Sequence, residues 1–286
     1  MEIKKVAVIG AGIMGSGIAQ VAATAGFNVV MRDISDVFVS RGLSVIGKNL
    51  DRDVQKNRLS REEADGILAR LKGTSDINDL ADCDFVIEAA VELIEPKKNI
   101  FRELDKICKP EAYFASNTSG LSITEMAAVT GRAPRFIGMH FFNPVPVMKL
   151  VELIKGTETN EETLQVTTDM VLKFGKDPIM VNESPLFAVN RILCPMINEA
   201  IFVLAEDVAS AADIDKGMML GCNHPIGPLA LGDLIGLDTL LNIMDSIYVE
   251  TGDSKYRACP LLRKKVRAGH LGRKTGRGFY DYSGKK

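Results

Sequence analysis

A glycine-rich turn near the start of the chain constrains the fold more than any other segment. The apolar run at residues 6–9 is typical of a strand buried on both faces, and apolar residues recur at helical spacing over 14–25. Between them Gly10, Gly12 and Gly15 form the pattern G-x-G-x-x-G. In that pattern the first glycine permits the turn, the second lets backbone N–H groups approach a pyrophosphate, and the third lets helix and strand pack closely. The segment therefore predicts a strand, a turn and a helix whose N-terminus faces the phosphates of a dinucleotide.

The next predicted strand, over residues 27–33, supplies the acidic residue that such a site needs. It ends at Asp33, whose carboxylate would accept hydrogen bonds from the adenosine ribose hydroxyls. The same negative charge would repel a 2′-phosphate, which favours NAD over NADP as the cofactor. The neighbouring Arg32 has two interpretations, a partner for that phosphate or a solvated surface charge.

The composition is that of a globular protein with an ample core. The 286 residues are 46% hydrophobic and 25% charged, enough for one large or two ordinary domains. The net charge of −2 gives no reason to expect a nucleic acid or a membrane surface as partner. The five cysteines are scattered without a C-x-x-C pair, so we expect reduced thiols rather than a disulfide framework or a metal site. No apolar run reaches the length of a membrane span, and the first strand begins too early for a leader to precede it, so we expect a cytoplasmic protein.

The order of predicted strands and helices divides the chain into two domains. Over residues 1–184 apolar strands alternate with helices, which predicts an α/β, Rossmann-like dinucleotide-binding domain. A helical hairpin over 35–56 and 58–72 is inserted after the second strand, and residues 185–286 form an all-helical C-terminal domain after a boundary at 182–185. The other predicted strands are 73–76, 84–88, 113–115, 135–139, 148–154 and 178–181, and the other helices are 96–108, 122–129, 161–174, 189–204, 212–220, 228–234, 237–250 and 260–268.

A dehydrogenase that oxidises an alcohol needs a group that takes the hydroxyl proton, and histidine is the usual choice. Of the three histidines, His270 lies in a basic tail that disfavours its protonated form, and His224 lies in a loop before a proline. His140 alone stands at the end of a core strand. Glu152 interrupts the apolar run of the following strand, where an unpaired carboxylate would be costly. Together they predict an acid/base dyad in which Glu152 orients the imidazole, and the alternative is a structural histidine that caps a strand.

Other polar residues are further candidates for the site. The loop 116–120 follows a strand, where ligand crevices form in open α/β sheets, so Asn117 and Ser119 are candidates unless the loop only caps the next helix. Asn190 begins helix 189–204, whose apolar surface is wide enough to predict deep burial or a subunit interface. Cations of the hairpin, Lys56 among them, form either a solvated face or a grip for an anionic substrate.

From His140 to Glu152 the chain reads H-F-F-N-P-V-P-V-M-K-L-V-E. This segment resembles the signature of the 3-hydroxyacyl-CoA dehydrogenases, most nearly their short bacterial members. Further motifs follow in the family's order along essentially the whole chain, namely the glycine turn, S-N-T-S at 116–119, V-N-R-I at 189–192 and the segments 225–238 and 272–280. The resemblance implies NAD-dependent interconversion of a 3-ketoacyl-CoA, such as acetoacetyl-CoA, and the (S)-3-hydroxyacyl-CoA in fatty-acid and butyrate metabolism. It also implies that the C-terminal domain binds substrate and forms a homodimer.

The resemblance also implies roles for individual residues. His140 would be the catalytic acid and base with Glu152 as its partner, while Ser119 and Asn190 would hydrogen-bond the 3-oxygen and the thioester region of the substrate. The residues implied around the cofactor, beside the glycine turn, are Asp33, Glu92, Lys97, Asn117, Ser119, Asn143 and Lys274, and Lys56 is implied near the coenzyme A moiety.

The chain departs from the family pattern at two positions. Leu186 stands where a glycine usually follows the proline, and Gly120 stands where a second serine is common. Neither position carries a proposed catalytic group. Two other functions remain open, a dehydrogenase of a free hydroxy acid and a non-catalytic dinucleotide-binding protein of the same fold. The second has no use for a buried acid/base pair.

Overall fold

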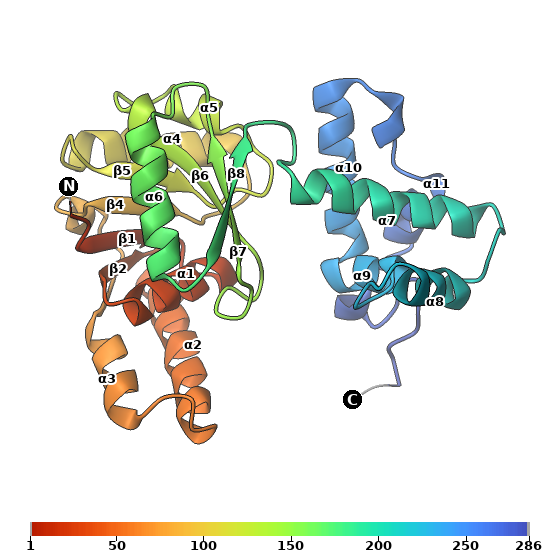
Figure 1. The fold of residues 1–286 in the computed structure, drawn as a ribbon, viewed down its shortest axis with the longest axis horizontal. Helices are drawn as coiled ribbons and strands as arrows, with labels where there is room; N and C mark the ends of the chain where they lie inside the picture. Colours follow the sequence, from red (N-terminus) through yellow and green to blue (C-terminus); the bar gives the residue numbers. More distant parts are fainter. Residues whose placement is uncertain (1, 285–286) are drawn as a thin grey trace. The chain divides into compact units, whose positions relative to one another are not determined.

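The computed structural model describes residues 2–284, which form two compact units divided between Ser184 and Pro185 (Figure 1). The first unit is an α/β unit built on one sheet, and the second contains helices and short 3₁₀ segments among its described residues. The predicted fold class, a Rossmann-like domain followed by a helical domain, is confirmed.

The sheet of the first unit has eight strands in the order β3-β2-β1-β4-β5-β6-β7-β8. All neighbouring pairs are parallel except β6 and β7, which run antiparallel. Because β1 is flanked by β2 and β4, the order reverses there, and ligands of such sheets bind beyond the carboxyl ends at that reversal. The strands are β1 Lys5–Ile9, β2 Asn28–Arg32, β3 Leu71–Thr74, β4 Phe85–Glu88, β5 Tyr113–Ser116, β6 Phe136–Phe141, β7 Leu150–Lys155 and β8 Asp177–Asn182.

Helices cover the sheet, and a hairpin of two of them extends from its edge (Figure 1). The helices of this unit are α1 Ile13–Thr24, α2 Asp36–Gln55, α3 Arg61–Ala69, α4 Ile94–Ile107, α5 Ile123–Ala127 and α6 Glu161–Lys173, with 3₁₀ turns at Ile77–Leu80 and Ala133–Arg135. Ser35 caps the hairpin's first helix, and Ser60 forms a capping box with Glu63 at its second. The predicted hairpin insertion is present. Its second helix, α3, ends at Ala69 and not at residue 72, because residues 71 and 72 already belong to β3.

The core lies on both faces of the central strands. Val6 and Val8 of β1 and Ile87 of β4 are fully buried, as the unbroken apolar runs predicted. Each such side chain contributes about 1.5–3 kcal/mol through its removal from water. The rigid sheet that results holds the strand ends, and therefore the candidate site, in fixed positions.

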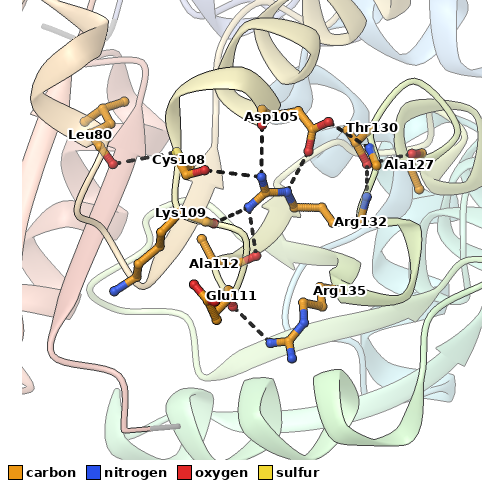
Figure 2. A network of polar contacts seen from close by, with 11 residues as sticks. Leu80, Asp105, Cys108, Lys109, Glu111, Ala112, Ala127, Thr130, Arg132 and Arg135 are labelled. Carbon is orange, nitrogen blue, oxygen red and sulfur yellow. Dashed lines mark hydrogen bonds and ion pairs between the residues drawn. The ribbon is translucent and has the colours of Figure 1, made fainter.

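Arg132 is the centre of a network of polar contacts near the amino-terminal ends of β5 and β6 (Figure 2). Arg132 is 8% exposed, its Nε donates to Asp105 Oδ1 at 2.6 Å, and its guanidinium lies 4.5 Å from the Phe114 ring centroid. Its remaining N–H groups donate to backbone carbonyls of Asp105, Cys108, Lys109 and Ala112. These carbonyls belong to the end of α4 and the turn into β5, where a helix leaves acceptors unsatisfied. The arginine thus fixes α4 against β5.

The second unit has its own apolar core, in which one row of the long helix is buried. Its helices are α7 Val189–Ala205, α8 Ala211–Gly221, α9 Pro228–Ile235, α10 Leu237–Thr251 and α11 Pro260–Arg267, with 3₁₀ turns at Ser254–Tyr256 and Arg273–Thr275. Cys194, Ile197 and Ile201 of α7 are buried, whereas Ile192 is 71% exposed. The apolar surface of α7 therefore extends beyond what this unit's core covers.

Buried aspartates hold the end of the chain against these helices. Asp233 of α9 is 1% exposed and accepts hydrogen bonds from the backbone N–H groups of Phe279 and Tyr280, at 2.9 and 3.0 Å. Asp215 of α8 accepts one from the Tyr280 hydroxyl at 2.7 Å. The turn-rich tail is therefore a packed part of this unit.

Leu186, the departure from the family's glycine, adopts a left-handed backbone conformation with φ of 63°. A residue with a side chain adopts that conformation at a cost of about 1–2 kcal/mol, whereas glycine adopts it without this cost. The side chain is 4% exposed, so apolar burial offsets the cost.

The structure bears on several expected absences. The five cysteines form no disulfide in the structure, and four of them are buried. Within residues 2–284 there is no cluster of side chains that could hold a metal ion. None of the helices in that range is long and apolar enough to cross a membrane.

Candidate functional site

His140 and Glu152 face one another on antiparallel neighbours, β6 and β7, as directly paired residues of the ladder. His140 Nδ1 lies 2.7 Å from Glu152 Oε2, and the two residues are 5% and 0% exposed. An ionised carboxylate only accepts hydrogen bonds, so Nδ1 carries the proton of this contact and Nε2 is the nitrogen that can exchange one with a reactant. The arrangement is that of an oriented acid/base pair.

The glycine turn and Asp33 form a second part of the site, at the end of β1 and β2. Gly10 N donates to Arg32 O at 2.8 Å, and Asp33 Oδ2 accepts from Ala11 N at 2.7 Å. No side chain among the described residues caps the N-terminus of α1, and a Cβ at Gly12 would meet nothing within 4 Å. An uncapped helix N-terminus beside open space is a fitting place for a pyrophosphate. These residues therefore fit a dinucleotide.

Arg32, the alternative phosphate partner, is turned inward in part. Its Nε is buried and has no hydrogen-bond partner within residues 2–284.

A buried ion pair lies beyond the ends of β4 and β5. Lys97 of α4 is 1% exposed, and its Nζ donates to Glu88 Oε1 at 2.6 Å and lies 3.3 Å from Glu92 Oε2. The Glu92 side chain is 45% exposed. The two cofactor candidates of this region, Glu92 and Lys97, are therefore in contact with each other.

The polar loop after β5 joins the same region. Ser119 N donates to Glu92 Oε1 at 2.6 Å, and Asn117 Oδ1 accepts from Phe141 N at 2.9 Å. The loop thus contacts both the ion pair and the strand that carries His140. The cap of α5 is Ser122, whose side chain accepts from Glu125 N, so capping alone does not explain the residues before it. Asn143 is exposed in the segment that follows β6.

The remaining candidates lie on the hairpin and in the second unit. Lys56 is exposed at the C-terminus of α2. Asn190 is half-buried in the first turn of α7. Lys274 Nζ lies 2.6 Å from Asp238 Oδ1 within the second unit. Of the hairpin's other cations, Arg61 is paired with Asp51 and Asp65, as expected of a solvated face.

Comparison with known proteins decides the family. The model of the 3-hydroxyacyl-CoA dehydrogenase NAD binding domain matches residues 5–184, and that of the 3-hydroxyacyl-CoA dehydrogenase C-terminal domain matches residues 187–282. The chain belongs to the 3-hydroxyacyl-CoA dehydrogenase family.

Within this family, several bacterial members are similar over their full length. A 3-hydroxybutyryl-CoA dehydrogenase of Bradyrhizobium diazoefficiens is 54% identical over 99% of this chain and 97% of its own, and a probable one of Bacillus subtilis is 52% identical over 100% and 99%. The crystal structure of (S)-3-hydroxybutyryl-CoA dehydrogenase from Ralstonia eutropha superimposes with a TM-score of 0.97, at 54% identity over 99% of this chain and 100% of that one.

Sequence reasoning missed Glu88, the buried acid that pairs with Lys97. It ends the strand motif F-V-I-E and is 0% exposed. A carboxylate in an apolar strand demands a partner, which is the argument that singled out Glu152. The same argument would have identified Glu88.

Proposed function

We propose that this chain is an NAD-dependent dehydrogenase that interconverts acetoacetyl-CoA and (S)-3-hydroxybutyryl-CoA in fatty-acid and butyrate metabolism. The observation that carries the proposal is the His140–Glu152 pair, a buried acid/base pair in a chain similar over its whole length to 3-hydroxybutyryl-CoA dehydrogenases. A protein that only binds a dinucleotide has no need of such a pair.

The residues of the dyad define the proton transfer. When bound, NAD supplies the hydride chemistry at its nicotinamide carbon. In reduction His140 Nε2 donates a proton to the existing 3-keto oxygen as it gains negative charge, and in oxidation His140 Nε2 takes the proton of the 3-hydroxyl group. Glu152 holds the imidazole through Nδ1 and compensates the positive charge of its protonated form. Ser119 and Asn190 hydrogen-bond the 3-oxygen and the thioester region, where negative charge develops.

The cofactor and coenzyme A are assigned to separate groups of residues. The glycine turn with Gly10, Gly12 and Gly15 receives the pyrophosphate, and Asp33 accepts from the ribose hydroxyls, so NAD is preferred over NADP. Lys56 contacts the coenzyme A moiety. The other residues assigned to the cofactor are Glu92, Lys97, Asn117, Ser119, Asn143 and Lys274.

The C-terminal unit, residues 185–286, is assigned to substrate binding and to a cytoplasmic homodimer. Its described surface exposes large apolar side chains, including Ile192 at 71%, Leu220 at 77% and Val249 at 82%. Apolar side chains of this size are stabilised when an interface removes them from water. Sedimentation of the purified protein should show a dimer, and a monomer at micromolar concentration would contradict this assignment.

Oxidation of NADH tests the function directly. Initial rates are compared for acetoacetyl-CoA, longer 3-ketoacyl-CoAs and free acetoacetate. We expect the highest kcat/KM with acetoacetyl-CoA. Preference for free acetoacetate would indicate a dehydrogenase of free hydroxy acids, and no turnover with any of them would indicate a binding protein.

A further inference from the structure

Glu88 is a fully buried carboxylate with a complete set of donors, and nothing in the reaction described above uses it. Its Oε1 accepts from Ala90 N and from Lys97 Nζ, both at 2.6 Å, and its Oε2 accepts from Ser116 Oγ at 2.5 Å. Its three partners come from the segment after β4, from α4 and from β5. The carboxylate therefore ties these three elements together at the carboxyl edge of the sheet.

The contacts continue from Glu88 towards the surface. Lys97, itself 1% exposed, lies between Glu88 and Glu92, at 2.6 and 3.3 Å from their carboxylates. Glu92 Oε1 in turn accepts from Ser119 N and from Thr118 Oγ1, both at 2.6 Å. A series of contacts thus runs from the sheet interior to the backbone of Ser119, which the proposed function places at the substrate. It consists of the Glu88–Lys97 hydrogen bond, the Lys97–Glu92 ion pair and the hydrogen bond from Ser119 N to Glu92.

The charges of these groups make the position of Lys97 depend on Glu88. A buried ammonium needs a nearby negative charge, because an uncompensated buried ion is strongly destabilising. Glu88 supplies that charge from a fixed position, since its strand and its other donors hold it. Lys97 is then fixed, and it fixes the more exposed Glu92. Without the Glu88 charge, Lys97 would be drawn to Glu92 or to water, and the hydrogen bond from Ser119 N would change.

We propose that Glu88 is a positioning residue which, through Lys97 and Glu92, holds the Ser119 loop in the geometry that the reaction requires. The inference rests on the proposed function for the role of Ser119, whereas the contacts themselves do not. A displacement of a substrate-positioning group by about 1 Å costs roughly 100-fold in rate, so the effect on turnover is measurable.

The test compares Glu88→Gln with Asp84→Asn. Asp84 lies just before the first residue of the same strand, at the opposite end from Glu88. It accepts hydrogen bonds from Lys4 N, Lys5 N and Lys109 Nζ. It is therefore a matched control, an acid that is paired with a lysine but does not contact the loop. We expect Glu88→Gln to lower kcat with acetoacetyl-CoA about 10- to 100-fold. It should also raise hydrogen–deuterium exchange at residues 117–120 in the cofactor-free protein. Asp84→Asn should lower Tm and leave both kcat and this exchange unchanged.

Each outcome decides the proposal. Glu88→Gln within about twofold of wild type in kcat and unchanged in exchange would overturn it. An equal loss of kcat in Asp84→Asn would also overturn the proposal, because general destabilisation of the fold would then explain the loss in Glu88→Gln. If the wild type is inactive, the proposed function fails, and the exchange comparison still decides whether Glu88 holds the loop.

Two further variants test the path. In Glu88→Gln/Glu92→Gln the loss of kcat should equal the larger single loss, since both residues act through one series of contacts. Losses that multiply would contradict a path through Glu92. If Glu88→Gln does not fold, Ser116→Ala takes its place, since it removes one donor and keeps the lysine paired. It should raise the same exchange to a smaller extent, and unchanged exchange would overturn the proposal.

Discussion

Buried acids determine the chemistry and the geometry of this site at the scale of single residues. Glu152 and Glu88 are both 0% exposed, and each has a donor within 2.7 Å. A buried carboxylate is tolerated only when such donors compensate it, so each acid fixes the position of its partner. In the function proposed here the partner of Glu152 exchanges protons, and in the further inference the partner of Glu88 helps to orient a loop.

The first prediction concerns His140. We expect His140→Gln to lower kcat about 10²- to 10⁴-fold, because glutamine keeps a hydrogen bond to Glu152 but cannot exchange a proton. NADH affinity, measured by fluorescence titration, should stay nearly unchanged. His224→Gln, in a loop of the second unit, is the control and should keep full turnover. Normal turnover in His140→Gln would refute the dyad.

The second prediction concerns the preference for NADH. Asp33→Ala removes the acceptor for the ribose hydroxyls and the charge that repels a 2′-phosphate, so NADH binding should weaken roughly tenfold or more. The advantage of NADH over NADPH in kcat/KM should narrow at the same time. Asp36→Ala, exposed in the first turn of α2, should change neither. An unchanged ratio in Asp33→Ala would count against Asp33 as the ribose ligand.

At the scale of elements, the sequence predicted most strands and helices because their apolar periodicity is strong. The wrong boundaries lie where periodicity is weak, as between α3 and β3, where Leu71 pairs with Val29 of the neighbouring strand. Long-range pairing of this kind leaves no trace in a local pattern. His140 and Glu152 were singled out by their place on predicted strands, but their register required the sheet. Arg132 gave no signal, because most of its hydrogen-bond partners are backbone carbonyls, which no residue type marks, and its one carboxylate partner, Asp105, is distant in sequence.

The third prediction concerns the packing of α1 against the glycine turn. A Cβ at Gly15 would lie 1.8 Å from Gly10 O, so Gly15→Ala must separate the helix from the strand. We expect a loss of several degrees in Tm and of NADH binding, in line with overpacking costs of about 1–3 kcal/mol. Gly47→Ala, in the middle of α2 with nothing within 4 Å, should instead stabilise by about 0.5–1 kcal/mol. Equal Tm values for the two variants would contradict this account.

At the scale of the whole molecule, each of the two units has its own apolar core. Buried thiols are distributed over both cores, with Cys83 and Cys108 in the first unit and Cys194 and Cys259 in the second. Burial raises the pKa of the Cys83 thiol to about 12, that of Cys108 to about 11 and that of Cys194 to about 12. The reactive thiolate forms of these three cysteines are therefore scarce at neutral pH in the folded chain.

The fourth prediction follows from this distribution. At pH 8 a disulfide reagent such as dithiobis-nitrobenzoate should modify one thiol per native chain, the exposed Cys222, and all five in denaturant. Cys222→Ser should abolish the fast reaction of the native protein and lower the number of thiols modified in denaturant by one. Fast modification of further thiols in the native protein would mean that one of the cores opens readily. Repeating the assay with NADH present would show which unit the cofactor protects.

The pairing of His140 with Glu152 across β6 and β7 has a consequence for how this enzyme family can vary. The ladder, rather than the segment between the strands, brings the two side chains opposite each other. Insertions or deletions in the exposed part of that segment after Asn143 are therefore compatible with activity as long as the strands keep their alignment. A slip of the ladder by a single residue is not, because it would turn Glu152 to the other face of the sheet and bring Val151 or Leu153 opposite His140. Loop length is thus open to evolutionary change, while strand alignment is under constraint.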